Sequence, residues 1–137
     1  MLIRRLAHVC LNVTDLQRSL AFYKKLGLKE RFDFTRRGRD FGRYLEISEK
    51  NYLELFEEPR QGAVINNGLA HFCLETEDLP ALMAHLNAQG VAFTPKKVGP
   101  DHTAQIWLED PDGNRFEVHE YTPQSMQLVG GSVEADW

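Results

Sequence analysis

The sequence predicts an α+β protein made of two tandem βαβββ modules. The segment Leu6–Leu11 returns 63 residues later as Leu69–Leu74, and the same offset carries Asp15 onto Asp78. In each copy an alternating strand pattern leads into a helical stripe of apolar residues. The chain is therefore a tandem duplication in which one order of elements occurs twice.

The first module is predicted over residues 1–58. It opens with a strand over residues 5–13, where side chains alternate with a period of two, and we expect both faces of this strand to be mostly buried. A helix follows, capped by Thr14 or Asp15 and ended by Gly27, because glycine readily takes the left-handed conformation at a helix end. Three further strands complete the module, at residues 28–35, 41–47 and 52–57.

The second module is predicted over residues 68–122. Its helix begins at Asp78 or Leu79 and ends at Gln89. Two strands close the module, and the turn Pro111-Asp112-Gly113 joins them, since Asp-Gly favours the positive φ values of tight hairpins. These strands are predicted at residues 104–109 and 114–121. Turn-rich residues 59–67 are expected to form a linker, and residues 123–137 a loosely held tail.

Composition limits the classes of function. The chain has 137 residues, is 42% hydrophobic and 26% charged, and carries a formal net charge of −4. That balance is typical of a globular protein and disfavours nucleic acid, whose binding needs a basic surface. No apolar run approaches the roughly 20 residues that cross a membrane, so we expect a cytoplasmic protein with no membrane partner. Cys10 and Cys73 are expected to stay reduced as small buried residues.

The duplication also repeats two residues whose types commonly bind metals. The offset of 63 places His8 and Glu54 of the first module onto His71 and Glu117 of the second. Imidazole nitrogen and carboxylate oxygen suit a divalent Zn, Ni, Co, Mn or Fe ion without any thiolate. A strand glutamate between apolar neighbours lies at the surface or in a functional cavity, and its presence in both copies favours the cavity. The sequence predicts one metal ion held by these four residues, in a cavity that the curved sheets enclose.

Other polar and aromatic residues are candidates for contact with a substrate. His119 follows Glu117 by two positions and shares its strand face, and the preceding strand offers Gln105 and Trp107. Arg43 is a candidate for binding an anionic group.

Several motifs resemble one family. The opening Leu-Ala-His-Val-Cys-Leu-Asn-Val-Thr-Asp-Leu, the segment Tyr52–Leu55, and the segment Glu109–Glu117 with its Asp-Pro-Asp-Gly-Asn turn resemble the vicinal oxygen chelate superfamily. This group includes glyoxalase I, extradiol dioxygenases, fosfomycin-resistance thiol transferases and bleomycin-binding proteins. The resemblance covers residues 3–122. The full set of two histidines and two glutamates is most similar to glyoxalase I, whose metal is held by one His and one Glu from each module.

Similarity to glyoxalase I implies a metal-dependent lyase or isomerase that acts on a small substrate with neighbouring oxygens. The expected substrate is the hemithioacetal of a 2-oxoaldehyde and a thiol, with Glu54 or Glu117 moving the proton. Bacterial glyoxalase I commonly has an arginine at the position of Asn12, where it meets the glutathione carboxylate. The identity of the thiol therefore stays open.

Two alternative functions follow from the same resemblance. The first is an Fe(II)-dependent dioxygenase that uses His8, His71 and Glu117. The second is a protein that sequesters a ligand without chemistry. Family members assemble their sites within one chain or across two chains, and we expect a homodimer.

Overall fold

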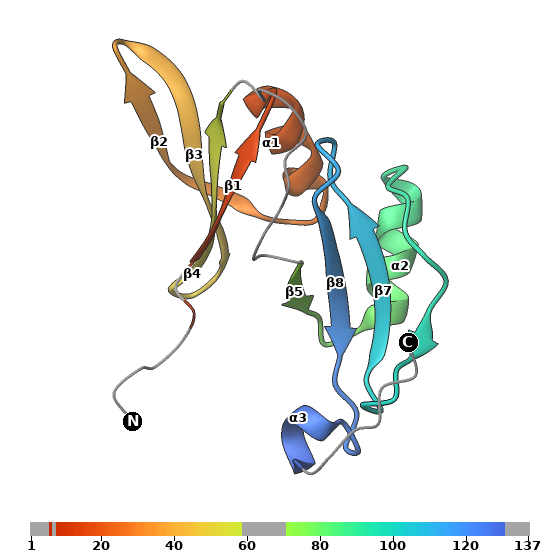
Figure 1. Cartoon of the computed structure of the whole chain (residues 1–137). Coiled ribbons are helices and arrows are strands. Elements are labelled where there is room, and N and C mark those ends of the chain that lie inside the picture. Colours follow the sequence, from red (N-terminus) through yellow and green to blue (C-terminus); the bar gives the residue numbers. More distant parts are fainter. Residues whose placement is uncertain (1–5, 7, 59–70, 131–137) are drawn as a thin grey trace. The chain divides into compact units, whose positions relative to one another are not determined.

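The protein is described from a computed structural model, which defines residue 6, residues 8–58 and residues 71–130. The chain forms two compact units, residues 1–67 and residues 68–137. Each unit contains one four-stranded mixed sheet and a helix between its first and second strands (Figure 1). The predicted α+β fold of two tandem βαβββ modules is confirmed.

The first unit has the strand order β1-β4-β3-β2, with β1 parallel to β4 and the other pairs antiparallel. Its last strand lies beside its first, so residues that are distant in sequence share one sheet face. The elements are β1 (His8–Val13), α1 (Leu16–Lys25), β2 (Lys29–Arg36), β3 (Arg39–Ser48) and β4 (Asn51–Glu57).

The second unit repeats this topology with the order β5-β8-β7-β6, and β5 is parallel to β8. Strand β6, which the predicted βαβββ repeat implies, is only two residues long, and its position could not be predicted because its sequence has no run of alternating apolar residues. The elements are β5 (Phe72–Glu75), α2 (Leu79–Ala88), β6 (Lys97–Val98), β7 (Ala104–Glu109), β8 (Arg115–Glu120) and α3 (Met126–Val129).

Two carboxylates hold the start of each long helix. Asp15 and Asp78 are the N-caps, and each accepts a hydrogen bond from the main-chain N–H three residues later. Glu57 and Glu120, at the ends of β4 and β8, accept hydrogen bonds from the first helical N–H at 2.8 and 2.6 Å. Because these N–H groups have no partner inside the helix, the contacts tie each helix to the last strand of its own module.

Each helix covers only one face of its sheet. Helix α1 packs on β3 and β4, and α2 packs on β8. Leu11 and Val13 are buried on β1, whereas His8, Cys10 and Asn12 are exposed. The expectation that both faces of this strand are mostly buried is therefore wrong.

In each unit the open sheet face carries a cysteine. Cys10 and Cys73 are free thiols and both are exposed. The prediction of small buried cysteines is wrong, because no helix covers the strand face on which they lie.

The segment after the last strand is held against the second unit. Ser125 is fully buried and its hydroxyl accepts a hydrogen bond from the N–H of Thr122 at 2.8 Å. Gln127 donates to Asp101 at 2.7 Å. The expected loose tail is therefore wrong for residues 123–130. The predicted linker and residues 131–137 lie outside the described residues. Within the described part of the chain, no helix is long and apolar enough to cross a membrane.

Candidate functional site

The first unit brings His8 and Glu54 together. The parallel pairing of β1 and β4 sets Cys10 opposite Glu54, so the histidine and the glutamate occupy the same open face. His8 Nε2 lies 3.8 Å from Glu54 Oε2. The carboxylate is mostly buried while the imidazole is half exposed.

The second unit reproduces this arrangement. The pairing of β5 with β8 sets Cys73 opposite Glu117. His71 Nε2 lies 3.5 Å from Glu117 Oε2, again with a half-exposed imidazole beside a mostly buried carboxylate. The structure thus brings each predicted histidine to the glutamate of its own module.

His119 is an additional donor beside the second pair. Its Nε2 lies 3.0 Å from Glu117 Oε2. This buried nitrogen has no hydrogen-bond partner. Buried polar atoms are nearly always satisfied, so an unpartnered nitrogen beside a carboxylate is a position that suits a cation.

The pKa values of the cysteines beside the two glutamates indicate the electrostatic potential at both pairs. Partial burial, together with a hydrogen bond to Glu54 and its charge, raises the pKa of Cys10 to about 11. Partial burial and the charge of Glu117 raise the pKa of Cys73 to about 12. Both surroundings disfavour a further negative charge and favour a cation. The donor types and this potential fit the divalent ion that the sequence predicts.

A pocket adjoins the second pair, with a volume of about 860 Å³. It contains all three candidate substrate contacts of this unit. Gln105 and His119 are buried in its wall, and Trp107 meets His71 edge-on with ring centres 4.9 Å apart. We call it the β7–β8 pocket; its lining is His71, Lys97, Val98, Gly99, Pro100, Asp101, Gln105, Trp107, Glu117 and His119.

The two remaining candidates lie in the first unit. Asn12 is on the open face of β1, opposite Phe56. Arg43 pairs with Leu55, so its side chain leaves the opposite face of the sheet from Glu54. Its guanidinium is engaged by Glu30 at 2.7 Å and Asp40 at 2.9 Å. The structure therefore does not bring Arg43 to the His8–Glu54 pair.

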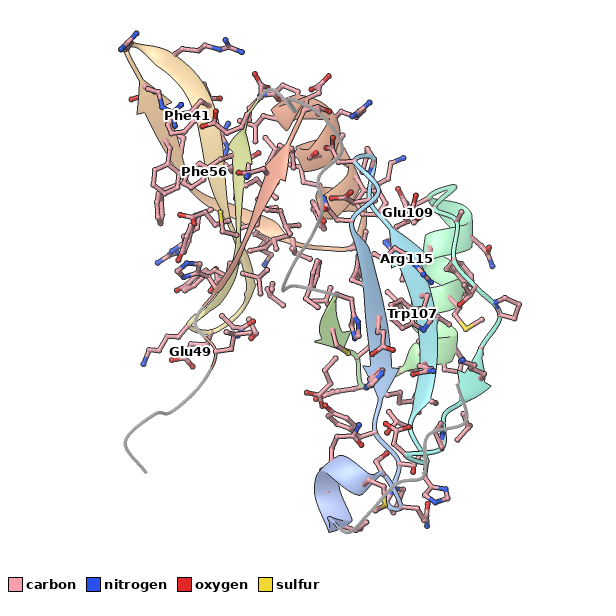
Figure 2. All side chains as sticks on the ribbon, in the orientation of Figure 1. Phe41, Glu49, Phe56, Trp107, Glu109 and Arg115 are labelled. Atoms are coloured by element: carbon pink, nitrogen blue, oxygen red, sulfur yellow. The ribbon has the colours of Figure 1, made fainter. Side chains whose placement is uncertain are left out.

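A group of aromatic rings beside His8 was not predicted as part of the site. The Tyr44 ring lies 5.7 Å from the His8 ring and stacks on Phe32 at 4.6 Å. Phe56 stacks on Phe41 at 5.2 Å, and Figure 2 shows these two side chains on the sheet of the first unit. Tyr44 and Phe56 both alternate in phase with Glu54 along neighbouring strands, which is the sequence signal that places them on its face.

Comparison with known proteins now identifies the family. Residues 5–118 match the Glyoxalase/Bleomycin resistance protein/Dioxygenase superfamily. The chain belongs to this superfamily. The family that the sequence motifs resemble is thereby confirmed.

Three relatives illustrate the range within the superfamily. A trivalent organoarsenical cleaving enzyme of Bacillus sp. (strain MD1) is 30% identical over 130 residues, covering 88% of this chain and 75% of that enzyme. Lactoylglutathione lyase GLX1 of Arabidopsis thaliana is 29% identical over 88% of this chain, which corresponds to 45% of the lyase. The crystal structure of a glyoxalase family protein from Enterococcus faecalis superposes with a TM-score of 0.74 at 26% identity, covering 88% of this chain and all of that one.

Proposed function

We propose that the protein is a metal-dependent lyase or isomerase of the glyoxalase I type, acting on a small substrate with neighbouring oxygens. One observation carries the proposal: His8–Glu54 and His71–Glu117 occupy equivalent places and approach to 3.8 and 3.5 Å. A structural role alone would not require both pairs to be kept on open sheet faces. The similarity to a lactoylglutathione lyase supports the same reaction class.

The proposed centre joins the two pairs around one divalent ion, Zn, Ni, Co, Mn or Fe. When bound, such an ion polarises adjacent substrate oxygens as a Lewis acid. Four protein donors then leave room for substrate only at a five- or six-coordinate ion. The pairs can combine within one chain or across a homodimer, and the ratio of metal to chain in protein of measured mass distinguishes these assemblies.

The protein groups divide the remaining work. Glu54 or Glu117 takes a proton from the substrate carbon and returns it to the neighbouring carbon, which is general base and then general acid catalysis. In the β7–β8 pocket, Gln105 offers an amide to a substrate oxygen and Trp107 an apolar wall. Asn12 cannot form the ion pair that an arginine makes with a thiol carboxylate, so we expect weak turnover of the glutathione adduct.

A second candidate function, cleavage of a small substrate by an Fe(II)-dependent enzyme of the dioxygenase type, is supported by a separate observation. The organoarsenical cleaving enzyme is similar over three quarters of its length. Two histidines and one carboxylate are the ligand set of non-haem Fe(II) enzymes. His8, His71 and Glu117 would supply that set, which also suits the dioxygenase alternative.

Elemental analysis of protein purified without added metal tests the proposal. We expect about one ion per assembled site and a loss of most of it in His8→Ala and in His71→Ala. His85→Ala on the exposed side of α2 is the matched control and keeps its metal. Unchanged occupancy in both site variants would remove the central claim. Iron together with oxygen uptake on a candidate substrate would favour the second function, whereas zinc or nickel with isomerase activity favours the first.

A further inference from the structure

The second module contains a cluster of three possible metal ligands, of which the proposed four-residue centre includes only Glu117. Cys73, Glu117 and His119 place one ligand atom each within 4.8 Å of one another. All three belong to β5 and β8, with Cys73 directly opposite Glu117 and His119 two residues further along the strand. The cluster therefore depends on one sheet and needs no contribution from the first module.

His119 is the strongest sign that this cluster has a ligand. Its side chain is nine-tenths buried, with 10% of its surface exposed. The Nε2 atom has no hydrogen-bond partner although Glu117 Oε2 is only 3.0 Å away. A neutral imidazole can leave a lone pair on this nitrogen, and a bound cation would satisfy it.

Cys73 is held at the same place by the main chain. Its sulfur lies within hydrogen-bonding distance of the Leu74 carbonyl, at 3.3 Å. The main-chain N–H of His119 also donates to this sulfur. The thiol thus rests against the β8 residue that supplies the imidazole.

We propose that Cys73, Glu117 and His119 form a second metal site, selective for thiophilic divalent ions such as zinc or cadmium. In a tetrahedral zinc site, sulfur and nitrogen ligand atoms are roughly 3.6 Å apart, given Zn–S and Zn–N bonds of about 2.3 and 2.1 Å. The widest separation in the cluster is 4.8 Å or less. Small side-chain rotations close this gap, and water completes the coordination.

Binding changes the protonation of the site in a defined way. The thiol proton of Cys73 leaves to solvent as the sulfur–metal bond forms, so each ion bound releases one proton from this residue. Glu117 belongs to both this site and the proposed four-residue centre. An ion bound through Cys73 therefore competes with an ion bound through His71 for the same carboxylate.

The duplication provides an internal control. The first module has Cys10 opposite Glu54, the same pairing as Cys73 with Glu117. It has Phe56 at the position that corresponds to His119. Only the second module can supply all three donors, so the thiolate signal should come from Cys73 alone.

Cobalt(II) is the probe, added to the whole metal-free protein with a reductant that contains no thiol. Thiolate ligation gives a near-ultraviolet sulfur-to-cobalt charge-transfer band. We expect this band in the unaltered protein, its loss in Cys73→Ser, and its retention in Cys10→Ser. His119→Phe should weaken the apparent Kd for the band at least tenfold. Because Cys73 is exposed, the serine variant should fold, and circular dichroism checks this.

The outcomes separate this site from the proposed function. Cobalt that binds the unaltered protein without the band overturns the thiolate site and leaves the proposed function intact. A band that survives in Cys73→Ser also overturns it. His8→Ala should keep the band, because His8 belongs only to the proposed four-residue centre. Loss of the band in His8→Ala would overturn the claim that the second module suffices.

Discussion

The two modules share their helix caps and their His–Glu pairs but differ in the wall beside each pair. In the first module the wall is aromatic, and in the second it is the polar β7–β8 pocket. Phe56 of the first module is equivalent to His119 of the second, and Gly42 is equivalent to Gln105. The duplicated modules thus retain the helix caps and the His–Glu pairs and differ in the residues of the wall beside each pair.

The aromatic wall explains why Gly42 lacks a side chain. A Cβ atom at this position would lie 2.5 Å from the Phe56 ring and 2.9 Å from the Leu55 carbonyl oxygen. Phe56 instead fills that space and stacks on Phe41, with ring planes 11° apart. In the second module Gln105 and His119 occupy the paired positions and leave a pocket.

This difference indicates separate tasks for the modules. The aromatic wall suits an apolar group or a rigid scaffold, because stacked rings hold each other in place. The polar pocket offers an amide, an imidazole and the Lys97 ammonium to an oxygen-rich ligand. If the modules are chemically unequal, equivalent substitutions in them should have different effects.

The largest expected effect comes from exchanging each glutamate for glutamine. Glu117 contacts two imidazoles, at 3.0 and 3.5 Å, whereas Glu54 contacts one, at 3.8 Å. We expect Glu117→Gln to lose most of its metal. Glu54→Gln should keep most of its metal and lose kcat by about 10²- to 10⁴-fold, the usual contribution of an acid–base group. Metal analysis and steady-state kinetics measure both. Equal loss of metal and rate in the two variants would mean that the modules are chemically equivalent.

The next effect concerns the cores of the modules. Leu53 and Phe116 are equivalent, and both are almost completely buried. Phe116→Ala should cost about 3–5 kcal/mol and Leu53→Ala about 2–5 kcal/mol of unfolding free energy. Tryptophan fluorescence in urea follows only the second half of the chain, where Trp107 lies, while circular dichroism follows both.

That pair of probes decides whether the modules unfold together. If they do, Leu53→Ala shifts the fluorescence and circular dichroism transitions equally. A fluorescence transition that is unmoved by Leu53→Ala would show that the second module unfolds independently.

Phe56→His gives the first module the imidazole that the second has. With Cys10 and Glu54 already paired, we expect a second thiolate site, so the cobalt charge-transfer band should roughly double at saturation. Phe56→Leu is the control, since it also removes the stacking on Phe41 but adds no donor. A band that stays at the level of the unaltered protein would show that residues beyond these three are needed.

The fold could be predicted from the sequence because its signals are local. Asp15, one of the two predicted candidates, caps the first helix, and the second helix starts where predicted, at Leu79 after the cap Asp78. Gly27 has the positive φ of 91° that ends a helix. The hairpin turn before β8 also follows the prediction, with Gly113 at a φ of 81°. These features depend on a few neighbouring residues and on backbone conformations that only some side chains allow.

The site could be predicted only in part because its environment is not local. Duplication identified the four candidate ligands, but exposure of Cys10 and Cys73 depends on which sheet face a helix covers. The orientation of Arg43 away from Glu54 follows from strand register. The short helix α3 was missed because hydrogen bonds to distant residues, not helix propensity, hold it.

The smallest expected effect concerns Asp101, whose counterpart in the first module is Gly38. Burial alone would raise the pKa of Asp101, but hydrogen bonds from Gln127 and Thr103 outweigh it and hold the pKa below its usual range. A lowered pKa in the folded state stabilises the protein above the unfolded pKa of about 3.9. That contribution is lost as the pH falls through the folded value.

Because Asp101 is only half-buried, we expect only local loosening of α3 between about pH 4 and the lower folded pKa of its carboxyl. The side-chain amide resonance of Gln127, followed by NMR from pH 6 to acid, should shift with a midpoint below that of a free aspartate. Asp101→Asn should abolish the shift, and Asp112→Asn should preserve it. An unchanged Gln127 resonance through this range would mean that the carboxylate does not hold α3. Residues 123–130 would then be held by the buried hydroxyl of Ser125 instead.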